Sequence, residues 1–249
     1  MGPRFMSSIV SAALVAALLL GAGPAAANHA TTDALLPDLG MAPLKDFSVQ
    51  KRPKGGRWLR FSAIIVNVGA GPFQAYGHTP AGGELSVDQQ FRTSGAIASH
   101  PTTARMYFGG DGHNHWHVRD LEQYVLEGAN TGRRYGEKHG FCFWDNYRYN
   151  TALAGYPLNA VYTGSNSCLT RGDGTVMMGL SIGWGDIYPS TIVDQYINIT
   201  GLPAGEYTIT ATADWNNEFI ESNDSNNSTT ARIRLSKNGV TVLDPGSGP

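Results

Sequence analysis

The chain has 249 residues, with 18 basic and 20 acidic side chains for a formal net charge of −2, and only 15% of its residues are charged. This near-neutral balance, without any cluster of Lys or Arg, argues against nucleic acid as the partner. The length is sufficient for one sizeable hydrophobic core.

Residues 1–30 differ in composition from the rest of the chain. Arg4 provides a basic start, residues 9–20 form a short apolar stretch, and Ala25-Ala26-Ala27 supplies the small residues that signal peptidase accepts. An apolar stretch interrupted by Ser11 is shorter than the ~20 residues that cross a bilayer. We therefore expect residues 1–27 to be a secretory signal peptide cleaved after Ala27, and residues 28–249 to be secreted without a membrane span.

Short segments rich in β-branched and aromatic residues follow one another along the remaining chain. They are residues 58–68, 117–126, 196–199, 206–214 and 229–235, with turn-forming segments such as Gly69-Ala70-Gly71-Pro72 between them. No convincing amphipathic helix is found. The pattern predicts an all-β, β-sandwich-like single domain over residues 28–249, with long structured loops, little helix and a frayed tail at 243–249.

Two cysteines, Cys142 and Cys168, occur in a chain that is expected to reach oxidising conditions. We expect a disulfide between them, because neither belongs to a Cys-x-x-Cys pair of the kind that binds metals. Two thiolate metal ligands are the alternative. The bridge would hold the loop 145–176, and loops of that length in compact domains are commonly functional.

Three of the seven histidines alternate in the sequence Gly109-Gly-Asp-Gly-His113-Asn-His115-Trp-His117. Alternate residues of an extended strand point to the same side, so three imidazoles share one face. A flat strand would separate the outer two by ~13 Å, and the preceding glycines permit the bend that one shared ion requires. Three neutral imidazoles suit copper, zinc or nickel and leave positions open for water, oxygen or substrate. The pattern predicts a metal site and does not fix the metal; an exposed His-rich turn is the alternative.

Two functions are compatible with such a triplet taken by itself. A zinc hydrolase would use metal-bound water as its nucleophile and would need a general base. The triplet offers Asp111 or Asp120 for that role, and neither has the helical spacing of His-Glu-x-x-His. A non-catalytic secreted copper-binding protein would need the triplet alone.

Three stretches together resemble the catalytic domain of lysyl oxidases: the histidine triplet, Lys138-His-Gly-Phe141-Cys142, and Gly183-Trp-Gly-Asp186-Ile-Tyr188 followed by Gln195-Tyr-Ile-Asn-Ile-Thr200. The resemblance covers most of the chain after residue 27. In that family a His-x-His-x-His motif binds copper, and a lysine four residues before a Phe-Cys cysteine is cross-linked to a tyrosine as lysine tyrosylquinone. The resemblance therefore implies copper on His113, His115 and His117, and a cross-link between Lys138 and Tyr188.

The same resemblance implies oxidative deamination of a primary amine, either a peptidyl lysine or a small amine. The amine RCH2NH2 would react with molecular oxygen and water to give an aldehyde, ammonia and hydrogen peroxide. A general base must remove the α-proton, and Asp186 is the first candidate, ahead of Asp145 and His139. The lysine adds to the ring only as a neutral amine, a form that burial or a nearby cation favours. The candidate wall residues of the substrate pocket are Trp116, Tyr147, Tyr149 and Trp184.

The resemblance also includes a structural calcium site made of two stretches. Leu36-Pro-Asp38-Leu39 and residues 221–227 resemble those stretches, and carboxylate, amide and backbone oxygens suit calcium. The ligands it implies are Asp38, the Leu39 carbonyl, Glu221, Asn223, Asn226 and Asn227. An Asn/Asp turn between strands is the alternative interpretation.

The chain departs from the animal members of this family in its cysteines. Those members carry one cysteine beside the histidine motif and one near the tyrosine, where this chain has Gly110 or Gly112 and Trp184. The animal disulfide framework cannot form here. The chain therefore resembles a small, microbial-type member without added domains.

Overall fold

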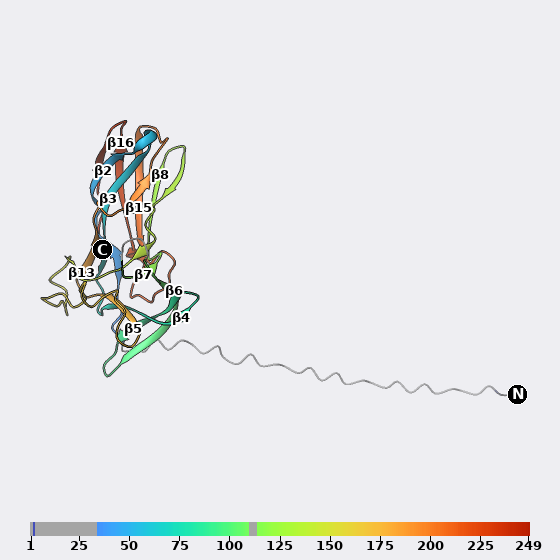
Figure 1. Cartoon of the computed structure of the whole chain (residues 1–249), viewed down its shortest axis with the longest axis vertical. Helices are drawn as coiled ribbons and strands as arrows, with labels where there is room; N and C mark the ends of the chain where they lie inside the picture. The colour runs from blue at the N-terminus through green and yellow to red at the C-terminus, as the bar shows by residue number, and fades with distance from the viewer. Residues whose placement is uncertain (1, 3–33, 110–113) are drawn as a thin grey trace. The chain divides into compact units, whose positions relative to one another are not determined.

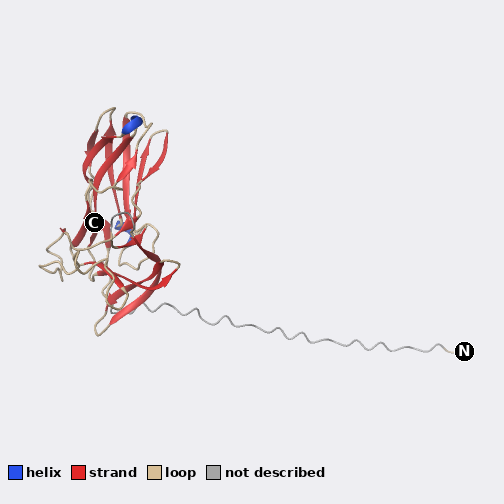
Figure 2. Ribbon diagram, viewed as in Figure 1, coloured by secondary structure: helices blue, strands red, loops and turns tan. Residues whose placement is uncertain are grey.

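The computed structural model describes residue 2, residues 34–109 and residues 114–249. Residues 34–109 and 114–249 are nearly all β and form three antiparallel sheets in a single domain (Figures 1 and 2). The predicted all-β, sandwich-like fold class is confirmed. No helix in the described part of the chain is long and apolar enough to cross a membrane. The expected signal peptide and its cleavage site at Ala27 lie outside the described residues.

The first sheet is built around one long strand, β3 (Arg57–Asn67). Its members are β1 (Leu39–Met41), β2 (Lys45–Lys51), β3, β11 (Tyr147–Arg148), β13 (Trp184–Tyr188) and β14 (Tyr196–Asn198). Residues 61–67 of β3 are all buried, as expected for a strand that is covered on both faces. Because β13 pairs with this buried half of β3, its residues have a fixed position in the core.

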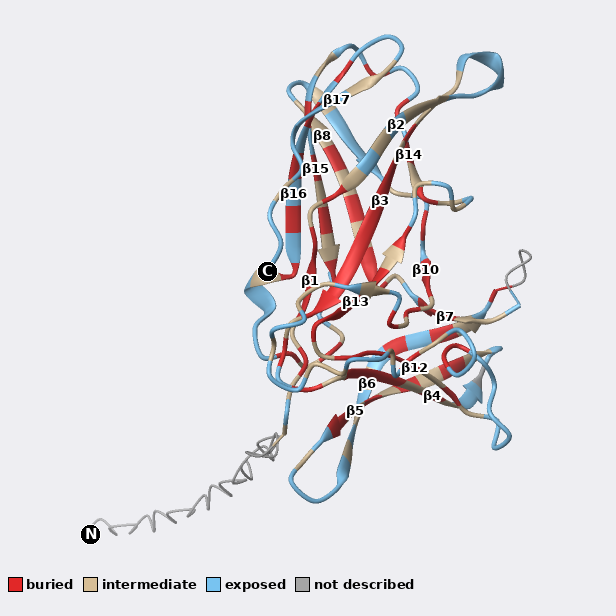
Figure 3. Cartoon of the chain, turned by 90° about the vertical axis from the view of Figure 1, so that its left-hand side faces the viewer, coloured by how far each residue is buried: buried red, intermediate tan, exposed pale blue. Residues whose placement is uncertain are grey.

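The second sheet alternates between buried and exposed side chains. Its order is β17 (Val240–Asp244), β16 (Ser228–Leu235), β15 (Gly205–Ala213), β8 (Glu122–Gly128) and β9 (Thr131–Tyr135). In β16 every second residue is buried, so one face of the sheet contacts the core and the other faces solvent. The sheet packs on β3, as the contact between Phe61 on β3 and Tyr124 on β8 shows. Their ring centroids are 5.1 Å apart in an edge-to-face arrangement. These two sheets form the sandwich (Figure 3).

The third sheet brings together segments that are distant in sequence. Its order is β10 (Gly140–Phe141), β7 (Trp116–Arg119), β6 (Ile97–Phe108), β5 (Glu84–Arg92), β4 (Phe73–Ala81) and β12 (Val176–Leu180). The described residues also include two short 3-10 helices, η1 (Pro53–Gly55) and η2 (Asp224–Asn226). The pairing of β10 with β7 places the lysine segment beside the histidine segment.

The strand expected at 117–126 is two strands in different sheets. Asp120 has a φ of 51°, in the left-handed region, which Asp tolerates better than most residues. Its backbone N–H donates to the carbonyl of His139 at 2.7 Å. The chain therefore turns at Asp120, leaves β7 in the third sheet and enters β8 in the second.

The predicted disulfide between Cys142 and Cys168 is present, with Cα atoms 5.8 Å apart. Cys168 is fully buried, and its carbonyl accepts a hydrogen bond from the backbone N–H of Trp116 at 2.8 Å. The loop 145–176 is irregular, as expected, apart from the short β11 and its last residue, where β12 begins. The bridge thus connects this loop to the segment that follows β10, and the hydrogen bond to Trp116 connects it to β7.

Removing this bridge is expected to lower the free energy of unfolding. In the chain-entropy model a closed loop of 26 residues contributes about 3 kcal/mol. A Cys142→Ala/Cys168→Ala variant should therefore show a lower urea midpoint than the wild type. Equal midpoints for the two proteins would show that the bridge contributes nothing to stability.

The C-terminal segment differs from the frayed tail expected at 243–249. Strand β17 extends to Asp244, and beyond it the Pro249 carbonyl accepts from the Tyr149 hydroxyl at 2.9 Å. The Ser247 carbonyl accepts from the Thr229 hydroxyl at 2.7 Å. These hydrogen bonds fix the backbone of the tail on the domain, and nothing in the Gly/Pro-rich composition of the tail indicated them.

Candidate functional site

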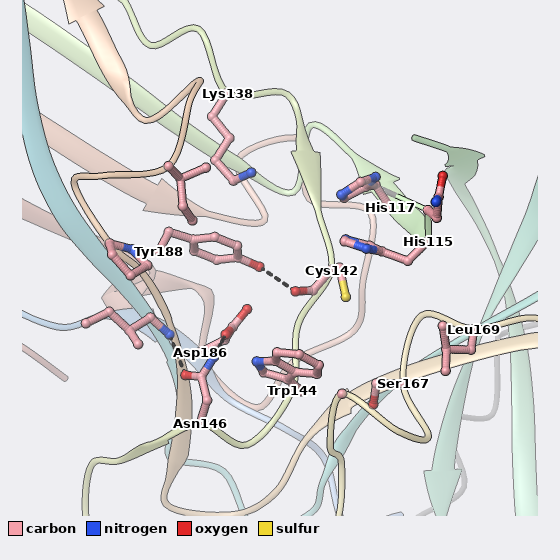
Figure 4. A pocket seen from close by; sticks show the side chains of 15 residues that line it. His115, His117, Lys138, Cys142, Trp144, Asn146, Ser167, Leu169, Asp186 and Tyr188 are labelled. Carbon is pink, nitrogen blue, oxygen red and sulfur yellow. Dashed lines mark hydrogen bonds between the residues drawn. The ribbon is translucent and has the colours of Figure 1, made fainter. Parts of the chain in front are cut away.

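A cavity of about 540 Å³ lies where the histidine, lysine and tyrosine segments meet. Its volume is within the usual range of small-molecule sites. Its chemically reactive lining residues are His115, His117, Lys138, Asp186 and Tyr188 (Figure 4). The structure therefore brings five of the predicted site residues to one cavity from three separate segments.

His115 and His117 lie at the start of β7 and point into the cavity (Figure 4). Their ring centroids are 4.5 Å apart; His117 is buried and His115 is half-buried. The backbone N–H of Gly109 donates to the His115 carbonyl at 3.0 Å, which joins the end of β6 to the start of β7. Two of the three predicted metal ligands thus share one face, and His113 lies outside the described residues.

A glycine allows the lysine segment to approach the histidine strand. A Cβ atom at Gly140 would lie 2.1 Å from the hydroxyl oxygen of Tyr107 and 3.2 Å from the Cβ of His117. Glycine is the residue that permits so close a backbone approach. The Lys138-His-Gly-Phe141-Cys142 motif therefore contains a glycine at this point because a side chain there would collide with Tyr107.

The Lys138 side chain is almost completely enclosed, at 4% exposure, and its amine has three neighbours. Nζ lies 3.6 Å from a carboxylate oxygen of Asp194, 5.1 Å from the ring centroid of Phe141 and 4.9 Å from that of Tyr188. The ion pair and the two rings hold the amine beside the Tyr188 ring. The lysine is therefore a buried residue of the site rather than a solvated loop charge.

Tyr188 ends β13 with its ring buried in the cavity wall. Its hydroxyl donates to the Cys142 carbonyl at 3.2 Å. Burial raises the pKa of Tyr188 well above its ordinary value, and the carboxylates of Asp186 and Glu122 raise it further. The phenol is therefore held in its protonated form unless a cation comes close.

Asp186 lies two residues before Tyr188 on β13 and lines the same cavity. It is 2% exposed, and one carboxylate oxygen accepts a hydrogen bond from the Asn146 side chain. Its Oδ2 is buried without a hydrogen-bond partner. Burial raises the pKa of Asp186 well above its ordinary value. Such a carboxyl group is suited to accept a proton inside a closed site.

The two other candidates for the general base are placed differently. The Asp145 carboxylate is already occupied, because it accepts from the backbone N–H groups of Val161, Tyr162 and Ser181 and from the Ser181 hydroxyl. The His139 side chain is 64% exposed and lies 2.7 Å from Asp120. Neither lines the cavity, whereas Asp186 does. Of the two bases considered for a zinc hydrolase, Asp120 contacts His139, and Asp111 lies outside the described residues.

The four aromatic residues expected in the substrate wall lie elsewhere. Trp184 stacks on Tyr156 and donates to the Pro157 carbonyl at 2.9 Å; it is four residues from Tyr188, which separates them by ~13 Å along a strand. Tyr149 contacts the C-terminal tail. The apolar wall of the cavity instead includes Trp144, Leu169, Ile187 and Ile192, which sequence patterns gave no means of selecting.

Most of the predicted calcium ligands come together between β1 and η2. The Asn226 amide donates to Asp38 at 2.8 Å, the Asn227 amide donates to Glu221 at 2.9 Å, and the Leu39 N–H donates to Glu221. The side-chain oxygens of Asn226 and Asn227 are buried without hydrogen-bond partners. Asn223 differs from the prediction, because its exposed side chain accepts from Ser225 within its own turn.

Burial raises the pKa of Glu221 to about 8. The cluster therefore combines a buried carboxyl group with two unsatisfied amide oxygens, the oxygen donor set that a hard cation prefers. A cation at this point would favour the ionised carboxylate. The residues fit the expected calcium site, with Asn223 excepted.

Two residues of this region carried no signal in the sequence. Asp194 lies in the loop before β14 and pairs with Lys138. Glu122 is the first residue of β8, buried to 2% exposure within the core. An isolated acidic residue at a strand end is ordinarily exposed, so only the three-dimensional arrangement identifies these two.

A comparison with protein families identifies a matching family. The family model described as lysyl oxidase matches residues 84–244. This range contains the histidine, lysine and tyrosine segments. None of the curated proteins matches the chain.

Proposed function

The chain belongs to the lysyl oxidase family, and from that premise we propose that it is a secreted copper amine oxidase. It would convert a primary amine, molecular oxygen and water into an aldehyde, ammonia and hydrogen peroxide. One observation carries this proposal: the Lys138 amine lies 4.9 Å from the centre of the Tyr188 ring, in the cavity that His115 and His117 line.

His113, His115 and His117 would bind the copper. Among the described residues no group of three or more His, Cys, Asp or Glu side chains is arranged around one point. The third ligand of the proposal, His113, lies outside them. The donor chemistry fits, because two imidazoles with ring centroids 4.5 Å apart and a nearby phenol suit copper(II). A cation there would also favour ionisation of the buried Tyr188 phenol.

Lys138 and Tyr188 would form the lysine tyrosylquinone. That group supplies an electrophilic carbonyl and accepts the two electrons that leave the amine. The amine of Lys138 already lies beside the ring, so the cross-link requires no rearrangement of the fold. Fixed positions for the two partners are what a covalent step between them needs.

Asp186 would take the α-proton of the substrate. Its carboxyl group is buried, and the residue lines the cavity, so the proton passes to a group that is shielded from bulk water. Trp144, Leu169 and Ile192 provide the apolar surface against which the body of an amine substrate packs. The substrate is proposed to be a peptidyl lysine or a small amine.

The experiment that tests the function loads the protein with copper in air and supplies benzylamine, n-butylamine, cadaverine and a lysine-containing peptide in turn. Aldehyde, ammonia and hydrogen peroxide should form in equal amounts from at least one of these amines. Protein loaded with zinc is the control and should produce none. Tight copper binding without peroxide from any amine would instead indicate a copper-binding protein.

Secretion is part of the proposal. The Cys142 to Cys168 disulfide is the kind of bond that persists in oxidising compartments. The exported protein is expected to begin at Asn28, which N-terminal sequencing measures. Export of the chain with Met1 still in place would contradict cleavage after Ala27.

A structural calcium ion is proposed at Asp38, the Leu39 carbonyl, Glu221, Asn226 and Asn227. The buried amide oxygens without partners support it. Because the pKa of Glu221 is about 8, calcium binding below that pH must displace a proton. The apparent affinity should therefore rise as the pH increases toward 8.

Calcium is expected to raise the thermal midpoint. At a concentration of about 100 times Kd the stabilisation is about 2.7 kcal/mol, which corresponds to roughly 5–10 °C for a domain of this size. Glu221→Gln should lose this shift. Glu206→Gln is the matched control, because Glu206 is exposed and paired with Arg234, and it should keep the shift. An unchanged midpoint in wild-type protein on adding calcium would refute the site.

A further inference from the structure

Lys138 lines a second cavity in addition to the one that holds Tyr188. This second cavity measures about 220 Å³, and its walls include Glu122, Tyr124, Tyr135 and Trp215. Tyr135 and Trp215 are 52% and 43% exposed, so its rim is in contact with solvent. The volume is sufficient for several water molecules. Lys138 therefore lines both the proposed quinone site and a separate small cavity.

Glu122 is the buried carboxyl group of this second cavity. One of its oxygens accepts a hydrogen bond from the Tyr124 hydroxyl at 2.5 Å, and the other, Oε1, is buried without a hydrogen-bond partner. Burial raises the pKa of Glu122 to about 7, with Tyr124 and the positive charge of Lys138 acting in the opposite direction. A group with such a pKa can exchange a proton near neutral pH.

The proposed cross-link needs the neutral amine of Lys138. An ammonium ion has no lone pair with which to form a bond to a ring carbon, so one proton must leave Nζ first. The side chain of Lys138 is 4% exposed, which restricts direct transfer to bulk water. A proton acceptor inside the protein therefore gives the proton a shorter path than transfer to bulk water.

We propose that Glu122 is the residue that accepts this proton and so prepares Lys138 for the cross-link to Tyr188. The proton passes from Nζ through water in the second cavity to the free Oε1. The ammonium and the carboxylate become an amine and a carboxylic acid, one proton moves, and no electron is transferred. The products are both uncharged, which suits their buried surroundings. This proposal rests on the proposed function of the site.

Asp194 has a different role, although it is the carboxylate in the ion pair with Lys138. Its side chain is 30% exposed, and it contacts Nζ directly at 3.6 Å. It therefore holds the ammonium ion in position. Each of the two carboxylates has one buried oxygen without a hydrogen-bond partner, but Glu122 lines the second cavity and Asp194 does not. Because both carboxylates lie near one amine, Glu122→Gln and Asp194→Asn form a matched pair of variants.

Charged and titratable groups face Glu122 from several elements. They are Tyr124 on β8, Lys138 before β10, Asp186 and Tyr188 on β13, Asp194 before β14, and Asp120, Tyr135 and His139 around the second cavity. A pH effect on the cross-linking rate is therefore assigned to Glu122 only if variants at Glu122 and Tyr124 change it.

The experiment starts from full-length protein prepared without metal. Copper(II) is added in air at pH values on both sides of 7, and mass spectrometry measures the rate at which the Lys138 and Tyr188 peptides become covalently joined. Wild-type protein should cross-link faster as the pH rises through about 7, because below that value Glu122 already carries its proton. Copper occupancy is measured in the same samples, so that metal loss at low pH is recognised.

The variants separate Glu122 from its neighbours. Glu122→Gln should form the cross-link about 100-fold more slowly above neutral pH. It should also lose the rise in cross-linking rate near pH 7, which is called the pH step below. Glu122→Asp should restore part of the rate. Asp194→Asn should keep the step. Tyr124→Phe removes the hydrogen bond that lowers the pKa of Glu122 and should move the step to higher pH.

A Glu122→Gln protein that cross-links at the wild-type rate with the wild-type pH step would overturn the role of Glu122 and leave the proposed function intact. The same holds if Asp194→Asn, and not Glu122→Gln, removes the step. Absence of any cross-link in copper-loaded wild-type protein would overturn both proposals together.

Discussion

Tyr188→Phe protein, loaded with copper in air, is expected to release no peroxide from any primary amine above background. A phenylalanine ring has no oxygen from which a quinone can form, so the whole contribution of the proposed cofactor is lost. The fold should persist, because the Tyr188 hydroxyl donates to the Cys142 carbonyl and also interacts with the Asp186 carboxyl group, and a hydrogen bond contributes about 1 kcal/mol. Peroxide release and thermal unfolding measure the two effects.

The matched control for this variant is Tyr207→Phe. Tyr207 is also buried and its hydroxyl also donates to a backbone carbonyl, that of Pro203, at 2.9 Å. It lies on β15, outside the cavity, so this variant should oxidise amines at the wild-type rate. Amine oxidation by Tyr188→Phe protein at a rate comparable with the control would exclude Tyr188 as part of the cofactor.

Asp186→Asn is expected to lower kcat by 10²–10⁴-fold with the Lys138 to Tyr188 cross-link still formed. Asparagine has the shape of aspartate and can still accept from Asn146, but it cannot take a proton. The pKa of Asp186 is raised well above its ordinary value, first by burial and then by the Glu122 charge. Because the base acts as the carboxylate, wild-type kcat/KM should rise as the pH increases through that raised pKa.

The pH dependence and isotope effects distinguish this role from a structural one. In Asp186→Asn protein the rise with pH should be lost, and a substrate deuterated at the α-carbon should show a larger isotope effect than in the wild type. Wild-type kcat with an unchanged pH profile in the variant would assign proton removal to another group.

Strands were predictable from sequence where the burial pattern is regular, either alternating or continuously apolar. Strand β16, with every second residue buried, and the apolar half of β3 were both predicted from their patterns. The break at Asp120 was missed, because a positive φ at an aspartate leaves no periodic signature. The tail at 243–249 was missed for a related reason: its hydrogen bonds are made by backbone carbonyls, which any sequence provides.

The candidate site was predictable to different extents. The histidines follow from their own alternation, whereas Lys138 and Tyr188 were identified by resemblance, since fifty residues of chain separate them and neither is unusual locally. The pairing of β10 with β7 and of β13 with β3 brings them together. The wall residues Trp144, Leu169 and Ile192 depend on side-chain packing in an irregular loop, which sequence periodicity does not describe.

Glu122 and Asp194 are two acidic residues of the site that only the three-dimensional structure identifies. Each is a single acidic residue with no motif around it, and both come close to the Lys138 amine through tertiary contacts. Burying carboxyl groups near one lysine is costly unless their charges are compensated. The enclosed position of Glu122 and the direct contact of Asp194 with the amine therefore favour roles in proton transfer and positioning over a contribution to stability.

Peptide mapping of the copper-loaded wild-type protein tests the central claim most directly. After aerobic incubation with copper and proteolysis, the peptide that contains Lys138 is expected to be covalently joined to the peptide that contains Tyr188, and the joined product should be absent from Tyr188→Phe protein. Two ordinary linear peptides in the wild-type digest, with copper fully bound, would contradict the account.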